Sequence, residues 1–167
     1  KKVSLAAATV AADSAFAAWQ SASCANGEPP SIAFSDLGPI VCGRHEYNAS
    51  QGNANVIVFR DETWPYTSST NALALTTITF NVDTGEIYDA DMELNGTADL
   101  TTDAAAPRYD LQSIMTHEQG HFLGLGHTTV SGSVMIASYS SGQVRSLSAD
   151  DRAGVCALYP VGYLDAG

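Results

Sequence analysis

Residues 116–128 read THEQGHFLGLGHT, and this stretch decides the fold of the 167-residue chain and the chemistry it can carry. His117 and His121 lie four positions apart, so on a helix both imidazoles project from one face and can share a metal ion. Gly124 can end that helix, because glycine readily takes the left-handed conformation of a sharp turn. The turn would bring His127 back as a third ligand. The pattern therefore predicts a metal site at the end of a helix.

The ligand set indicates a catalytic metal. Three neutral histidine nitrogens leave one coordination position open for water, which is typical of catalytic zinc and not of closed structural sites. Glu118 follows the first ligand directly, where it can reach a zinc-bound water without binding the metal itself. The metal would acidify that water and polarise a substrate carbonyl, and Glu118 would take the proton as general base.

Periodicity predicts the elements around this motif. Apolar residues at helical spacing predict a first helix over residues 5–21, and the motif itself belongs to a helix over residues 110–123. Ser148 can cap a last helix that ends near residue 159, before Pro160. Strands are expected over residues 55–60, 73–81 and 86–95. The order of elements predicts an α+β domain, and the unbroken apolar run NVIVFR is typical of a central strand.

Composition and charge limit the classes of partner that the chain can bind. Hydrophobic residues make up 45% of the chain and charged residues 15%, as in a folded globular domain. The 18 acidic residues against 7 basic ones give a net charge of -11, which repels nucleic acid and anionic lipid. The sequence contains no apolar run of the roughly 20 residues that span a bilayer. We expect neither nucleic acid nor membrane as a partner.

The chain has three cysteines, none of them in a close metal-binding pair. A bond between Cys24 and Cys42 would close a short loop after the first helix and stabilise the fold by about 3 kcal/mol. On that interpretation Cys156 is a buried thiol within an apolar helix. The alternative is that all three cysteines are buried thiols.

Three further segments resemble one family of zinc peptidases. Eight residues after His127, Met135 lies within SVMIASY, which resembles the Met-turn of the metzincins. LSADDRAGVCALYP, residues 147–160, is similar to the C-terminal helix of their matrixin branch, and AFAAW, residues 15–19, resembles its first helix. Thr128 keeps the hydroxyl that matrixins have as serine after the third histidine. The chain is thus identified by resemblance as matrixin-like, in a minimal form of bacterial style.

The resemblance implies a fold and a domain organisation. It implies a single two-lobed catalytic domain over residues 1–167, with an upper lobe of about residues 1–124 and a lower lobe of about residues 125–167. The upper lobe would hold a mixed, mostly parallel twisted sheet with an antiparallel edge strand, together with the active-site helix. The C-terminal helix would belong to the lower lobe.

The resemblance also implies roles for residues near the metal. Met135 would lie beneath the zinc as an apolar base without binding it. Asp150 and Asp151 could be taken as a catalytic carboxylate pair, but the resemblance gives them structural roles, one of them bracing the Met-turn. Animal matrixins bind a second, structural zinc through histidines that residues 60–81 of this chain lack, so we expect a single catalytic zinc.

Substrate contacts follow from the same resemblance. In the family an extended substrate pairs with the edge strand, which places Leu73, Ala74 and Leu75 against it. Ser113 would form the floor of a side-chain pocket, and Tyr139 belongs to the wall segment over residues 136–144. Because serine is small, we expect an open pocket that accepts a medium or large apolar side chain.

A calcium site is a further expectation. Matrixins often bind calcium near these strands, and carboxylate oxygens suit that ion. The acidic residues concerned are Asp83, Glu86, Asp89, Asp91 and Glu93. The alternative is a solvated strand face, since the last three alternate and would point outward.

Together these features predict a secreted, monomeric zinc endopeptidase that acts on peptide or protein substrates. Two alternatives stay open, because the motif specifies hydrolysis and not the substrate. One is a metzincin scaffold that binds peptide without turnover, which the presence of Glu118 disfavours. The other is a zinc amidase or a peptidase of narrow specificity.

Overall fold

The structure is a computed structural model that describes residues 3–41, 43–67, 71–103, 109–139, 142 and 144–162. Each predicted helix is present, with bounds within one residue of those expected. The elements in chain order are α1 Leu5–Gln20, β1 Ile57–Phe59, β2 Ala74–Phe80, β3 Ile87–Leu94, β4 Leu100–Thr101, β5 Tyr109–Asp110, α2 Leu111–Phe122 and α3 Ala149–Leu158. The α+β fold is confirmed, and the short pair of β4 and β5 was not predicted.

The main sheet has the strand order β1-β3-β2. β1 runs parallel to β3, whereas β2 runs antiparallel to it, so the expected mixed sheet with an antiparallel edge strand is confirmed. The prediction that the NVIVFR run forms the central strand was wrong for the described sheet, because β3 lies in the middle and β1 at an edge. Acidic residues alternate along β3, and this pattern did not indicate that the strand is buried.

The acidic side chains of β3 are buried, so the alternative of a solvated strand face was also wrong. The exposed fractions in β3 are 4% for Asp89, 2% for Asp91 and 0% for Glu93. Asp91 accepts a hydrogen bond from the backbone N of Val56 at 2.8 Å. Glu93 forms an ion pair with Arg60, whose Nε lies 2.5 Å from Glu93 Oε1. A buried carboxylate is tolerated when such partners replace its water.

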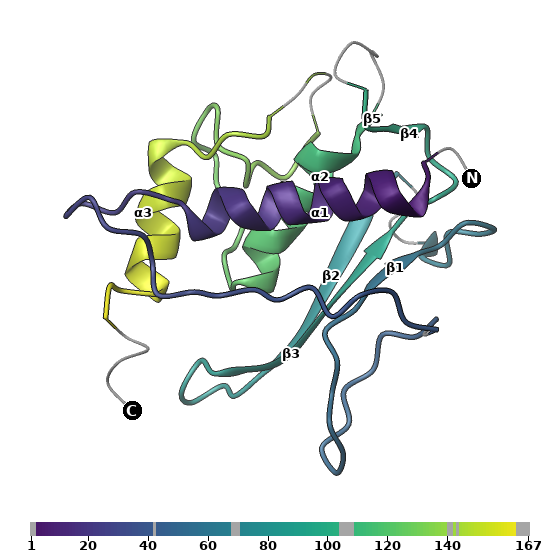
Figure 1. The fold of residues 1–167 in the computed structure, drawn as a ribbon, viewed down its shortest axis with the longest axis horizontal. Coiled ribbons are helices and arrows are strands. Elements are labelled where there is room, and N and C mark those ends of the chain that lie inside the picture. The colour runs from purple at the N-terminus through teal and green to yellow at the C-terminus, as the bar shows by residue number, and fades with distance from the viewer. Residues whose placement is uncertain are drawn as a thin grey trace.

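Helices α1 and α2 pack together and contribute to one apolar core with the sheet (Figure 1). Small residues of α1 (Ala8, Ala11 and Ala15) are buried, which allows a close approach to the neighbouring helix. Trp19 near the end of α1 is fully buried, and its Nε1 donates to the carbonyl of Thr116 in α2 at 2.9 Å. In the part of the chain that the structure describes, every helix is too short or too polar to cross a membrane.

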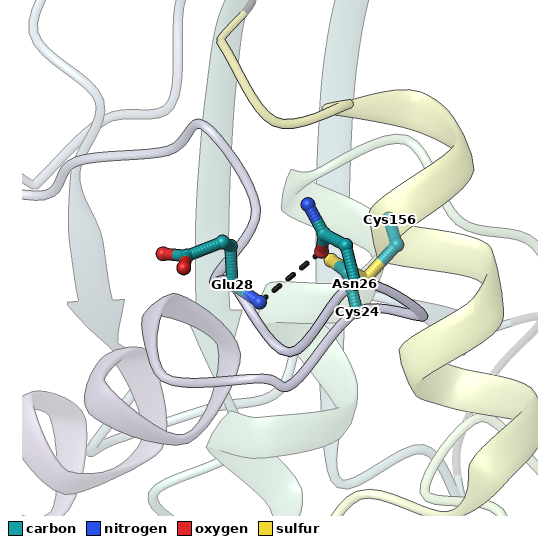
Figure 2. The surroundings of a disulfide bond; sticks show 4 residues. All are labelled: Cys24, Asn26, Glu28 and Cys156. Carbon is teal, nitrogen blue, oxygen red and sulfur yellow. Dashed lines mark hydrogen bonds between the residues drawn. A yellow bond between two sulfur atoms is a disulfide. The ribbon is translucent and has the colours of Figure 1, made fainter.

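A disulfide joins the loop after α1 to α3, and it is not the bond that we predicted. Cys24 is bonded to Cys156, 132 positions away in the sequence (Figure 2). The predicted partner, Cys42, lies outside the described residues. Cys156 is therefore a cross-link and not a core thiol. Neighbouring bonds hold the same loop, since Cys24 N donates to Glu28 O at 2.9 Å and Ser31 N donates to Tyr159 O at 3.1 Å.

We predict that replacing both Cys24 and Cys156 by alanine lowers the free energy of unfolding by about 3–5 kcal/mol, because the bond restricts a long loop of the unfolded chain. Denaturant unfolding of the double variant and of the wild type measures this difference. Cys42→Ala is the matched control and should leave the stability nearly unchanged. A peptide map of unreduced protein that links Cys24 to Cys42 would contradict the assignment.

Candidate metal centre

The active-site helix α2 begins and ends at defined caps. Asp110 is its N-cap and accepts from the backbone N of Ser113 at 2.9 Å. At the other end Gly124 has φ 90°, Gly124 N donates to His121 O at 2.8 Å, and Leu125 N donates to Gly120 O at 2.9 Å. This is the Schellman arrangement of a helix C-terminus. The predicted helix stop at Gly124 is thus confirmed, and the turn sends the chain back toward the helix.

The turn brings three imidazoles to one point. The Nε2 atom of His121 lies 3.1 Å from Nε2 of His117 and 3.1 Å from Nε2 of His127, and the last two are 3.3 Å apart. Nitrogens bound to one tetrahedral zinc at about 2.0–2.1 Å lie roughly 3.3 Å from each other. Among the residues that the structure describes, these histidines form the one cluster of His, Cys, Asp or Glu with such convergence. Their geometry fits a zinc ion.

The hydrogen bonds of the Nδ1 atoms determine which nitrogen of each ring faces the metal. His117 Nδ1 lies 2.7 Å from the carbonyl of Val134, and His121 Nδ1 lies 2.8 Å from the carbonyl of Leu125. A carbonyl can only accept, so each Nδ1 carries the proton and each Nε2 keeps its lone pair for a metal. Burial, together with the charges of the neighbouring histidines, lowers the pKa of His117 to about 4. Burial likewise lowers the pKa of His127, so both rings favour the neutral form that binds metal.

The Met-turn lies directly beneath the ligand helix. Met135 is 2% exposed and packs against Gly120, where an added Cβ would overlap Met135 Sδ and lie 2.9 Å from its Cε. Thr128 N donates to Met135 O at 3.0 Å, which ties the chain just after His127 to the same turn. Only a glycine in α2 leaves space for this thioether.

Asp151 of α3 braces the turn that contains Met135. It is 3% exposed and accepts from Ser133 Oγ at 2.5 Å and from Val134 N at 3.0 Å. It also accepts from Ser148 N at 2.7 Å in a capping box. Burial alone would raise the pKa of Asp151, but these hydrogen bonds outweigh it and lower that pKa. Asp151 is placed as a structural brace, whereas its neighbour Asp150 is exposed.

Glu118 is buried beside the histidines, with 7% of its surface exposed. Burial raises its pKa, while a hydrogen bond from Thr76 and the charge of His121 act in the opposite direction. That bond joins Thr76 Oγ1 to Glu118 Oε2 at 2.6 Å. Thr76 belongs to β2, so the edge strand contacts the expected general base directly.

A cleft of about 910 Å³ contains the three histidines and Glu118. The residues expected to contact substrate all line it: Leu73, Ala74 and Leu75 along one side, and Ser113 and Tyr139 on the other. Sequence reasoning had brought these segments together only through the family resemblance. The structure places them around one cavity.

Polar contacts attach Tyr139 and Val144 of the cleft wall to the start of α2, and the sequence had not singled out two of the residues involved, Asp110 and Arg145. Arg145 donates from Nε to Asp110 Oδ2 at 2.9 Å and from Nη2 to Asp110 Oδ1 at 2.5 Å. Ser113 Oγ donates to Asp110 Oδ2 at 2.6 Å and accepts from Val144 N at 2.9 Å. Tyr139 OH accepts from Asp110 N at 2.8 Å. Ser113 therefore does more than leave space, because it holds the wall in place.

The five carboxylates considered for calcium do not meet at one point. Asp83 and Glu86 are exposed at the hairpin turn, whereas Asp89, Asp91 and Glu93 lie buried along β3. No three of these side chains offer converging oxygens among the described residues. The calcium site stays a prediction.

Comparisons with known proteins agree with this geometry. A family model described as Matrixin, peptidase M10, matches residues 2–160. Metalloendoproteinase 1-MMP of Arabidopsis thaliana is 36% identical over 80 residues, which are 47% of this chain and 20% of that protein. Stromelysin-3 of Xenopus laevis is 46% identical over 50 residues, 30% of this chain and 10% of that protein. Interstitial collagenase of Bos taurus is 48% identical over 52 residues, 30% of this chain and 11% of that protein. The matches span a fifth or less of these relatives.

We predict that Asp151→Asn lowers the free energy of unfolding at neutral pH by about 2 kcal/mol, the typical loss for charged hydrogen bonds. The pKa of Asp151 is lowered in the folded protein, so its contribution is present above the unfolded value and is lost as pH falls through the folded value. The variant should therefore lose less stability than the wild type between about pH 5 and pH 2.

Denaturant unfolding of chelator-treated protein across this range measures the effect without a contribution from zinc release. Asp150→Asn changes the exposed neighbour in the same helix and serves as the control. Equal pH profiles for the two variants would contradict the bracing role of Asp151.

Proposed function

Because this chain belongs to the matrixin family of peptidases, we propose that it is a zinc-dependent endopeptidase that hydrolyses peptide bonds in protein substrates. The observation that carries the proposal is the convergence of three Nε2 atoms within 3.1–3.3 Å, in a cleft that also contains Glu118. His117, His121 and His127 would hold the metal, and Glu118 would act on the attacking water. Met135 would support the ligands from below.

The residues of the chain divide the catalytic work. Zinc, when bound, polarises the scissile carbonyl and makes a water more acidic. Glu118 accepts the proton of that water as it attacks and then delivers the proton to the leaving amine. Burial suits Glu118 to the first of these steps, because a raised pKa makes its carboxylate a stronger base toward the proton of the water. The carbonyls of Val134 and Leu125 keep His117 and His121 in the orientation that binds the metal.

We propose that an extended substrate pairs with β2 as an additional strand. β2 is an edge strand of the described sheet, and its residues Ala74 and Leu75 line the cleft together with Leu73 just before the strand. An unpaired strand edge offers backbone donors and acceptors to a peptide, and such pairing depends little on the peptide sequence. Sequence preference would then come from the side-chain pocket.

That pocket would receive the apolar side chain that follows the scissile bond. Ser113, Tyr139 and Val144 line it, together with apolar residues of α2 and the Met-turn. The hydrogen bonds of Asp110 to Arg145, Ser113 and Tyr139 would set the distance between the wall and the helix.

Further features of the whole protein belong to the same proposal. We place residues 1–167 in one catalytic domain with lobes over about residues 1–124 and 125–167, since the family match extends over residues 2–160. The disulfide supports secretion, because such bonds persist in oxidising compartments. We also propose that the protein is a monomer that binds a single zinc ion, and that it is a matrixin of a minimal, bacterial type.

We predict that the purified protein contains about one zinc per chain and cleaves a denatured protein or a peptide library. Glu118→Ala should keep the zinc but lose roughly a hundredfold to ten-thousandfold in kcat, because general-base catalysis contributes that much. His121→Ala should lose the zinc. Elemental analysis and mass spectrometry of the cleavage products measure both effects.

The same experiment separates the alternatives. A zinc-loaded wild type that cleaves nothing spared by Glu118→Ala refutes the endopeptidase proposal. Peptide binding without turnover would then indicate a binding scaffold. Cleavage restricted to one amide or one partner would indicate an amidase or a peptidase of narrow specificity.

We predict that Arg145→Gln weakens the preference for the residue after the scissile bond. Without the ion pair to Asp110 the wall loses an anchor, so the ratio of kcat/KM between the best and a smaller apolar residue should fall by roughly threefold to tenfold. Cleavage-site profiling with the peptide library measures this ratio. Arg44→Gln, at an exposed position, is the control. A cleavage profile of Arg145→Gln equal to that of the wild type would show that this anchor of the wall does not determine specificity.

A further inference from the structure

The carboxylate of Glu118 has one side-chain partner among the residues that the structure describes, and that partner is Thr76. Thr76 Oγ1 lies 2.6 Å from Glu118 Oε2 and 3.2 Å from the backbone carbonyl of the same residue. A hydroxyl has a single proton, and the shorter distance together with the negative charge of the carboxylate favours donation to Oε2. The general base is thereby bonded to a side chain of the edge strand.

We propose that Thr76 is a positioning residue that selects which oxygen of Glu118 acts as the base. This inference rests on the proposed peptidase function. The terminal torsion of glutamate is broad, so a carboxylate without a partner samples many orientations of its two oxygens. The hydroxyl of Thr76 occupies Oε2 and fixes the carboxylate plane. Oε1 remains for the proton of the attacking water.

The location of Thr76 suits this task. Glu118 is 7% exposed, and a buried carboxylate without a hydrogen bond is strongly disfavoured. Thr76 is held in the sheet opposite Met92, which is itself fully buried in the central strand. Threonine is branched at Cβ and therefore stiff at χ1, so a rigid strand presents its hydroxyl in few directions.

The inference connects substrate binding with proton transfer. Leu73 and the first β2 residues, Ala74 and Leu75, line the cleft where the proposed substrate pairs, and the next residue along the strand is Thr76. The strand that registers the peptide backbone thus also orients the base. In this arrangement the scissile bond and Oε1 are positioned from one rigid element, which is the kind of preorganisation that lowers a barrier.

The neighbouring residue provides a matched control. Thr77 follows Thr76 in the same strand but is exposed, because successive strand residues point to opposite faces. It is absent from the described lining of the cleft. Thr76→Val and Thr77→Val therefore make the same chemical change, and only the first removes a hydrogen bond to Glu118.

The test measures kcat, KM, zinc content and unfolding for wild type, Thr76→Val, Thr76→Ser and Thr77→Val on one peptide substrate. We expect Thr76→Val to keep its zinc and its KM but to lose roughly 10-fold to 100-fold in kcat, as for a hydrogen bond to a charged group. Thr76→Ser retains the hydroxyl and should recover most of kcat. Thr77→Val should match the wild type. If Thr76→Val fails to fold, Thr76→Ser and Thr76→Ala make the same comparison, since they differ only by the hydroxyl.

Two results overturn the inference while leaving the peptidase function intact. One is a zinc-loaded Thr76→Val enzyme with kcat within about twofold of wild type. The other is a Thr76→Ser enzyme as impaired as Thr76→Val or Thr76→Ala, which would show that packing and not the hydroxyl matters. A wild type no more active than Glu118→Ala would overturn both proposals together.

Discussion

The Nδ1 atoms of His117 and His121 each lie against a backbone carbonyl, and the rest of the site depends on these two contacts. They decide the tautomer of each ring and direct both Nε2 atoms to one point. The carbonyl of Leu125 belongs to the turn that ends α2, so the sequence of the motif supplies it locally. The carbonyl of Val134 belongs to the Met-turn, which must be held in place from elsewhere. The proposed metal site is therefore only as rigid as that turn.

Helix α3 supplies the rigidity. Asp151 accepts hydrogen bonds from Ser133 and Val134, so a buried charge of α3 fixes the backbone next to Met135. An apolar cluster joins the same helix to the end of α1 and to the Met-turn. The disulfide of Cys156 adds a covalent link to the loop after α1. Segments distant in the sequence thus converge on one carbonyl, which explains how a short last helix can support a site that it does not touch.

The two sides of the cleft are positioned by different means. The wall is attached through polar contacts to Asp110 at the start of α2, in which a bidentate arginine neutralises a buried carboxylate. The opposite side is a strand whose backbone is fixed by the central strand β3. Arg60 compensates the charge of Glu93, which allows that part of β3 to lie buried despite its acidic side chain. A rigid edge and an anchored wall together define the space that a peptide would occupy.

The sequence by itself determined the cluster of three histidines, the helix stop at Gly124 and the α+β fold, whereas the mixed sheet was expected only from the family resemblance. It could do so because helix-face spacing and turn chemistry are local properties, readable within a few residues. Only the tertiary structure decided that Cys24 pairs with Cys156, that the acidic residues of β3 are buried and that Thr76 meets Glu118. Each of these depends on a partner far away in the chain, and alternation or composition cannot reveal whether such a partner exists. Packing brings the partners together, and burial then increases the free energy that would be lost if their contacts were broken.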